Sequence, residues 1–155
     1  MKWLLLLLTH AGVGFAGFAL GIYLLPILIA QAPPTDSEMS MASANSLFTS
    51  KFTRELEGSD FLHWGEGVIS LKADKIVFQG ELAPGPDYKL YLSPKYVETE
   101  EAFLRIKPQM VLVGDIKSFN GFLLDVPNHI DISAYSNVVV WCETFSEFIT
   151  AAQYQ

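Results

Sequence analysis

The residue whose side chain offers the most distinctive chemistry is Cys142, the one cysteine in a chain of 155 residues. A thiol acts as a nucleophile or a metal ligand in its thiolate form, so a cation, a helix N-terminus or a metal must lower its pKa from about 8.5. The adjacent side chains, Trp141 and Glu143, favour the protonated thiol instead. Without a second cysteine, oxidation gives a sulfenate, a mixed disulfide or a dimer. Cys142 is therefore either a redox-active thiol or a small residue of the core.

His63 is the second candidate, because a histidine beside a cysteine can activate the thiol or supply half of a metal site. It lies far from Cys142 in sequence, so the tertiary fold has to bring the two together. The alternative is a histidine that is hydrogen-bonded in a turn, just before Gly65 and Gly67. The sequence supports both interpretations.

The sequence predicts no metal site and indicates no particular cofactor. A blue-copper centre needs two histidines, a cysteine and an axial ligand, but no histidine or methionine follows Cys142. The C-x-x-C-H motif of covalent haem is absent, and one cysteine cannot form a multi-cysteine zinc site. The Gly85-Pro86-Asp87 segment is interpreted as a turn. Without a phosphate-binding loop, a dinucleotide fingerprint or a nucleophile elbow, we expect no classical enzyme.

The segment around Cys142 has the densest run of β-branched residues in the chain. In a strand, alternate side chains point to opposite faces, so Val138, Val140 and Cys142 would share one face. Val139 and Trp141 would point the other way. Both faces are apolar, which is typical of a central strand that is covered on both sides.

Apolar alternation and turn residues predict further strands along the chain, and one helix. The strands are expected over residues 67–72, 75–82, 88–93, 110–117, 121–126 and 137–145, with residues 147–154 closing the domain. The helix is expected over residues 98–107, where Thr99 is a suitable N-cap. Residues 75–82 and 88–93 are predicted to pair as consecutive antiparallel strands. About seven to eight short strands predict an all-β fold, either an antiparallel β-sandwich or a small barrel.

The N-terminus adds a segment that suits a membrane. Residues 3–30 are almost entirely apolar and exceed the roughly 20 residues that a membrane-spanning helix needs. A cleavable signal peptide is the alternative, but its apolar region usually spans about 7–15 residues, and Pro33 disfavours cleavage after Ala32. We predict an uncleaved transmembrane anchor over residues 1–30, a Pro- and Ser-rich flexible linker over 31–48, and a β domain over 49–155.

The charge pattern predicts how this helix is oriented. Lys2 precedes it and no Lys or Arg follows until Lys51, so the positive-inside rule places the N-terminus in the cytoplasm. The β domain is then periplasmic or extracellular. The net charge of −7 argues against binding nucleic acid through a basic surface. The lipid bilayer, contacted through residues 3–30, is an expected partner.

Small residues on the apolar helix raise a further hypothesis. Gly17 and Gly21 form a G-x-x-x-G motif, which lets two membrane helices approach closely and would support a homodimer. Glycine is common in membrane helices, so the alternative is a motif with no role in dimerisation, which one short motif favours. His10 lies on the same face near the expected cytoplasmic end, where we expect a neutral, paired histidine.

Three stretches of the chain, in this order and at these separations, resemble one known family. They are Phe61-Leu62-His63-Trp64-Gly65-Glu66-Gly67-Val68, Gly85-Pro86-Asp87-Tyr88-Lys89-Leu90-Tyr91-Leu92-Ser93 and Trp141-Cys142-Glu143-Thr144-Phe145. The family is the DM-thirteen domain family, a module often labelled an electron-transfer domain, and the resemblance covers roughly residues 49–154. It implies an all-β fold and a redox role centred on the cysteine that matches Cys142, and His63 matches the family's histidine. The N-terminal anchor resembles that of membrane-tethered bacterial members.

Two functional hypotheses follow. The first is a membrane-anchored extracytoplasmic β domain with a redox or electron-transfer role, in which Cys142 reacts with help from His63 and a redox protein is the partner. The second is a non-catalytic binding or scaffolding domain in which Cys142 is a core residue. The two hypotheses differ in one measurable property, the accessibility of the Cys142 thiol.

Overall fold

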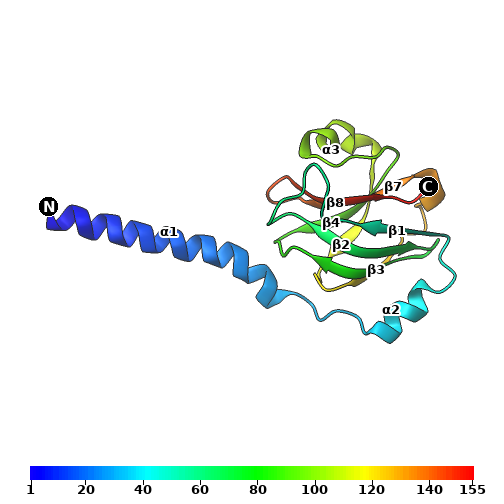
Figure 1. Ribbon diagram of the computed structural model, residues 1–155, viewed down its shortest axis with the longest axis horizontal. Helices are drawn as coiled ribbons and strands as arrows, with labels where there is room; N and C mark the ends of the chain where they lie inside the picture. The colour runs from blue at the N-terminus through cyan, green and yellow to red at the C-terminus, as the bar shows by residue number, and fades with distance from the viewer.

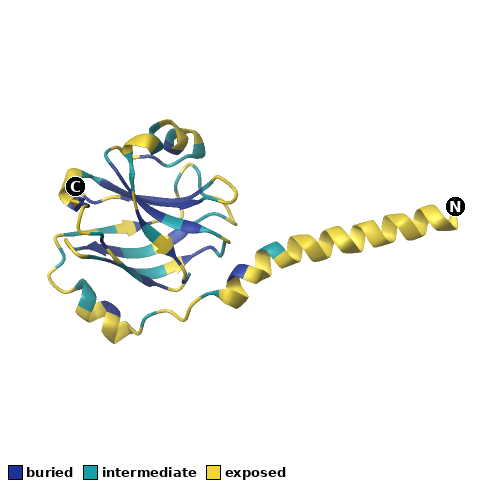
Figure 2. Ribbon diagram, turned by 180° about the vertical axis from the view of Figure 1, so that it is seen from behind, coloured by how far each residue is buried: buried dark blue, intermediate teal, exposed yellow.

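The computed structural model describes residues 1–155, which form a long apolar helix followed by a β-sandwich. Helix α1 (Lys2–Ile29) projects from one side of the domain, as Figure 1 shows. It is long and apolar enough to cross a membrane, and a signal sequence has the same properties. Nearly all of its residues are exposed, whereas the strands of the domain are largely buried (Figure 2).

Eight strands form two antiparallel sheets of four strands each. The first sheet has the order β1 (Phe48–Phe52), β2 (Gly65–Leu71), β3 (Lys75–Leu82) and β6 (Phe122–Asp125). The second has the order β5 (Val111–Ile116), β4 (Tyr88–Ser93), β7 (Asn137–Cys142) and β8 (Glu147–Gln153). The helical elements of the domain are α3 (Glu100–Ile106), η1 (Lys107–Gln109) and η2 (Ile132–Ala134). The predicted all-β sandwich of seven to eight strands is confirmed.

The main core lies between the two sheets, because apolar side chains alternate along strands that face each other. β7 contributes Val138, Val140 and Cys142 to this core, as its sequence predicts. The opposite face of β7 carries Val139 and Trp141, which belong to a second apolar cluster with α3. All of β7 is buried and it lies between β4 and β8, so the predicted central strand is confirmed.

The pairing predicted between residues 75–82 and 88–93 is wrong. β3 pairs with β2 and β6, whereas β4 pairs with β5 and β7 in the other sheet. The connection between them contains Pro84 and Pro86, which lack the N–H group that a hairpin ladder uses and which fix the backbone dihedral φ. The chain therefore crosses from one layer of the sandwich to the other at this point.

The sequence does not predict two of the observed elements. β1 is an edge strand that alternates between exposed and partly buried residues and buries only Phe52, so it shows no clear apolar pattern. α2 (Asp36–Ser43) lies within the segment expected to be an unstructured linker. Its N-terminus is a capping box, in which the Thr35 side chain accepts the N–H of Glu38 and the Glu38 carboxylate accepts the N–H of Thr35. Local capping and the buried Met39, rather than apolar periodicity, account for this helix.

Gly80 on β3 lies where β2 and β3 approach each other closely, so a substitution at this position tests that approach. It lies opposite Gly67, and a Cβ atom at position 80 would overlap the carbonyl oxygen of Glu66. We predict that Gly80→Ala lowers the free energy of unfolding by about 1–3 kcal/mol, because the backbone must move to relieve the overlap. The measurement is a urea titration of the full chain in detergent, followed by tryptophan fluorescence.

Gly114→Ala is the matched control for this substitution. A Cβ atom at Gly114 would meet nothing closer than 3.9 Å, so we expect a change of about 0.5 kcal/mol or less. Equal losses of unfolding free energy in the two variants would show that the close approach of β2 and β3 does not cause the loss in Gly80→Ala.

Candidate functional site

Strand ends from both sheets meet at one end of the sandwich and place the candidate residues there. Cys142, the last residue of β7, lies opposite Tyr88 at the start of β4 and opposite Glu147 at the start of β8. In the other sheet, β2 begins at Gly65, opposite Leu82 at the end of β3. The loops that join these strands therefore gather at the same end.

A cavity of about 230 Å³ lies among these loops and is closed on one side by α1. Its lining is mainly apolar and consists of Ala19, Ile22, Tyr23, Leu62, His63, Pro84, Gly85, Pro86, Tyr88, Cys142, Phe145, Glu147 and Ile149. The tertiary fold therefore brings Cys142 and His63, which are far apart in sequence, to the same cavity.

Cys142 is only 2% exposed and belongs to the core between the sheets. Burial raises the pKa of the Cys142 thiol, and the negative charge of Asp87 raises it further. Hydrogen bonds from the backbone at Phe145, Asp87 and Thr144 offset part of this increase. Because the pKa ends above its ordinary value, the thiol is protonated at neutral pH.

Tyr88 is a site residue that the sequence analysis does not single out. It is 3% exposed, and burial, followed by the proximity of Cys142, raises the pKa of Tyr88 well above its ordinary value. Gly85 makes room for the phenol ring, because a Cβ atom at that position would overlap it. The alternation along residues 88–93 places Tyr88 on the core face, but its position opposite Cys142 depends on the register of β4 against β7.

His63 lies in the loop between β1 and β2 and is oriented by Asp60. Its Nδ1 atom is 3.1 Å from Oδ2 of Asp60, and Oδ1 of Asp60 accepts the backbone N–H groups of Leu62 and His63, each at 2.7 Å. Burial opposes the charge of Asp60, but these hydrogen bonds lower the pKa of its carboxyl group overall. His63 is thus hydrogen-bonded in a turn, as the second of the two interpretations from the sequence predicts. It also lines the cavity.

Glu143, which follows Cys142 directly, points to the other face of the sheet. Its carboxylate accepts hydrogen bonds from Nζ of Lys107, at 2.6 and 2.8 Å, and from the hydroxyl of Tyr91. Burial acts to raise the pKa of Glu143, but Lys107 and Tyr91 lower it overall. The carboxylate that acts on the thiol is therefore Asp87, and not Glu143 as the sequence suggests.

The site offers a neutral thiol, a neutral phenol, an imidazole and the carboxyl group of Glu147 around a mainly apolar cavity. No group of three or more His, Cys, Asp or Glu side chains is placed to hold a metal ion. A protonated thiol is a weak nucleophile, and its burial keeps bulky reactants away. The arrangement suits slow chemistry with small, uncharged molecules that can enter the cavity.

Residues 48–154 match the family model described as Electron transfer DM13. The match begins with β1 and ends just after β8, so it covers the whole sandwich and leaves out α1 and α2. It contains both Cys142 and His63. No curated protein and no solved structure matches the chain.

The raised pKa of Cys142 predicts a specific loss of stability at alkaline pH. In the unfolded chain the thiol ionises near pH 8.5, whereas in the folded protein it stays protonated to higher pH. The folded state therefore loses stability as the pH rises above about 8.5, by up to about 1.4 kcal/mol per pH unit, until the folded thiol ionises as well.

The Cys142→Ala variant isolates this contribution, because the buried tyrosines are common to both proteins. We expect the unfolding free energy of the wild type to fall more steeply than that of the variant between about pH 8.5 and 10.5. Denaturant titrations at a series of pH values measure the two slopes. Parallel curves would contradict a raised thiol pKa.

Proposed function

Since the chain belongs to the electron transfer DM13 family over residues 48–154, we propose that it is a membrane-anchored electron-transfer module with Cys142 as its redox-active group. The domain lies outside the cytoplasm, in the periplasm or the extracellular space, and a redox protein is its partner. The observation that carries this proposal is the cavity that Cys142 shares with His63. The family supports the redox role, and the cavity supplies a route for a small reactant to a thiol that is otherwise buried.

Burial restricts the oxidised forms that suit Cys142. A mixed disulfide or a dimer needs a second sulfur about 2 Å from the thiol, which an exposure of 2% does not allow. Hydrogen peroxide is small enough to enter the cavity. Sulfur then forms a bond to the near oxygen, the O–O bond breaks, and the thiol proton leaves with the far oxygen as water, giving a sulfenic acid.

His63 is the proposed helper in this step. Imidazole takes up and releases protons near neutral pH, so it can accept the thiol proton as the S–O bond forms and return it to the departing oxygen. Its Nδ1 atom is held by Asp60, which fixes the ring beside the cavity. Reduction of the sulfenic acid back to the thiol takes two electrons and two protons and releases water, and the redox partner supplies the electrons.

Helix α1 is the proposed membrane anchor, as in the membrane-tethered bacterial members that the N-terminus resembles. It has 28 residues, and Lys2 is its one charged side chain. The positive-inside rule supports a cytoplasmic N-terminus. Gly17 and Gly21 have open space around them, which supports homodimerisation through this face as a further proposal.

The second candidate function is a non-catalytic binding or scaffolding domain in which Cys142 is a core residue. The burial of Cys142 in the core between the sheets and its raised pKa favour this alternative. A thiol that serves only as packing reacts when the protein unfolds and not before. The two functions therefore predict opposite results for the folded protein.

If Cys142 is redox-active, hydrogen peroxide should oxidise it in the folded full chain. After catalase removes the peroxide, unfolding in urea with dimedone then labels the sulfenic acid. We expect His63→Gln to slow the labelling about tenfold or more, because the proton acceptor is lost. The control is His129→Gln, since His129 lies exposed in a loop outside the cavity, and we expect no change in rate. Mass spectrometry of the peptide that contains Cys142 measures the rate. Labelling that appears only when the chain is unfolded before the peroxide is added would reject the redox role in favour of the core residue.

The proposal of an uncleaved anchor leads to a separate prediction about the mature N-terminus. Because Pro33 disfavours cleavage at residues 30–32, we expect protein isolated from membranes to retain Met1 or Lys2. Intact-mass measurement reads this directly. A mature chain beginning at Pro33 would identify a cleaved signal sequence and a secreted protein.

A further inference from the structure

Two loops beside the Cys142 cavity expose large apolar side chains. Phe61 and Leu62, between β1 and β2, are 84% and 41% exposed, and Phe145, between β7 and β8, is 49% exposed. Leu62 and Phe145 line the same cavity, so the two loops are neighbours. A group of exposed apolar side chains at one end of a domain is typical of a surface that a partner covers.

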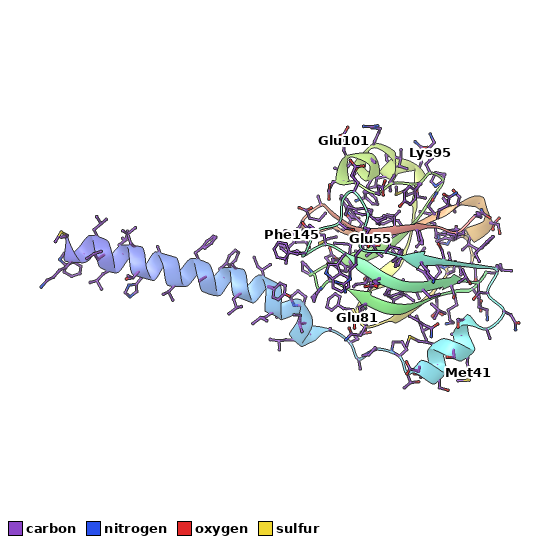
Figure 3. All side chains as sticks on the ribbon, in the orientation of Figure 1. Met41, Glu55, Glu81, Lys95, Glu101 and Phe145 are labelled. Carbon is purple, nitrogen blue, oxygen red and sulfur yellow. The ribbon has the colours of Figure 1, made fainter.

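The same loops lie close to α1. Ala19, Ile22 and Tyr23 form the helix side of the cavity. Further along, Pro26 is buried, and the N–H of Gln31 donates to the carbonyl oxygen of Lys117 at 2.8 Å. Figure 3 shows Phe145 at the edge of the domain that is nearest to α1. The apolar loops therefore extend the apolar surface of the helix sideways.

The sequence of α1 indicates the depth at which these loops lie. Trp3 and Tyr23 are 20 residues apart, which corresponds to about 30 Å along a helix. This length equals the thickness of the hydrocarbon core of a bilayer, and Trp and Tyr are enriched at its two interfaces. Tyr23 then marks the outer interface, and the loops that share its cavity lie at the same level.

The charges around the loops indicate the type of lipid. Asp60 precedes Phe61, Glu147 lines the cavity, and no Lys or Arg lines it. Anionic lipids are therefore not attracted electrostatically, and burial of apolar surface must supply the binding energy. We infer that Phe61, Leu62 and Phe145 rest in the outer interface of a bilayer of neutral lipids, so that the Cys142 cavity opens toward lipid rather than bulk water.

This inference rests on the proposed anchoring by α1 and adds a direct contact between the β domain and the membrane. The test uses the full chain in phosphatidylcholine nanodiscs that contain lipids with a shallow nitroxide group. In a Cys142→Ala background, Phe61→Cys carries a small fluorophore at the proposed contact. Met41→Cys carries it at the control position, which is 67% exposed on α2 and lies on the far side of the domain (Figure 3). Circular dichroism verifies that both variants are folded.

We expect quenching at position 61 to be at least about twofold stronger than at position 41, because nitroxides quench only at short range within the interface. Adding Phe145→Asp should reduce quenching at position 61 toward the value at position 41, since a charge disfavours insertion. Leu112→Asp is its matched control, because Leu112 is 44% exposed on edge strand β5, outside the cavity, and this change should have no effect.

The outcomes separate the membrane contact from the anchor. Equal quenching at positions 61 and 41, in a chain that co-elutes with the nanodiscs, would overturn the contact and leave the anchoring intact. A chain that elutes apart from the nanodiscs would overturn the anchoring, and the contact with it.

Discussion

The structure depends on the burial of β7 on both of its faces. Its inner face packs between the two sheets, and its outer face is covered by α3, where the ring of Phe103 stacks on Trp141 with centroids 3.9 Å apart. Lys107, at the end of α3, is paired with Glu143 and reinforces the same contact. β7 also pairs with a strand on each side, β4 and β8, so its backbone N–H and C=O groups have partners as well. The position of Cys142 follows, because β7 ends where the core meets the cavity.

At this position, the same burial that favours the packing of Cys142 disfavours the reactivity of its thiol. Burial of a neutral thiol is favourable, but it raises the thiol pKa and so disfavours the thiolate that most cysteine chemistry uses. Oxidation to a sulfenic acid would add a polar oxygen beside the core, and that oxygen needs a hydrogen-bond partner. The Tyr88 phenol, directly opposite in the ladder and kept protonated by its own burial, is a donor at the right end of the sheet. Under the proposed redox role, the side chain that would bind this oxygen is therefore Tyr88, on the neighbouring strand.

The sequence predicts well what depends on local pattern and poorly what depends on register between distant segments. Alternation along residues 138–142 assigned both faces of β7 correctly, and the same rule identified β3 and β4 with their observed bounds. Their pairing was wrong because alternation does not distinguish a hairpin from a crossover between sheets. β1 was missed because an edge strand with one fully buried residue has no periodic apolar signal. The sequence does not show that Tyr88 and Asp87 lie beside Cys142, because the register of β4 against β7 depends on the whole sheet.

The path of the chain between α1 and the sandwich also bears on function. A wholly flexible linker would let an anchored domain rotate freely above a membrane. Here α2 packs beside β3 and β6, and the Gln31 backbone is bonded to Lys117 at the end of β5. The two attachments bring the last turns of α1 against the end of the sandwich that holds His63 and Cys142. The cavity therefore faces the helix because the chain path directs it there, and contact with lipid would add to an orientation that the protein already favours.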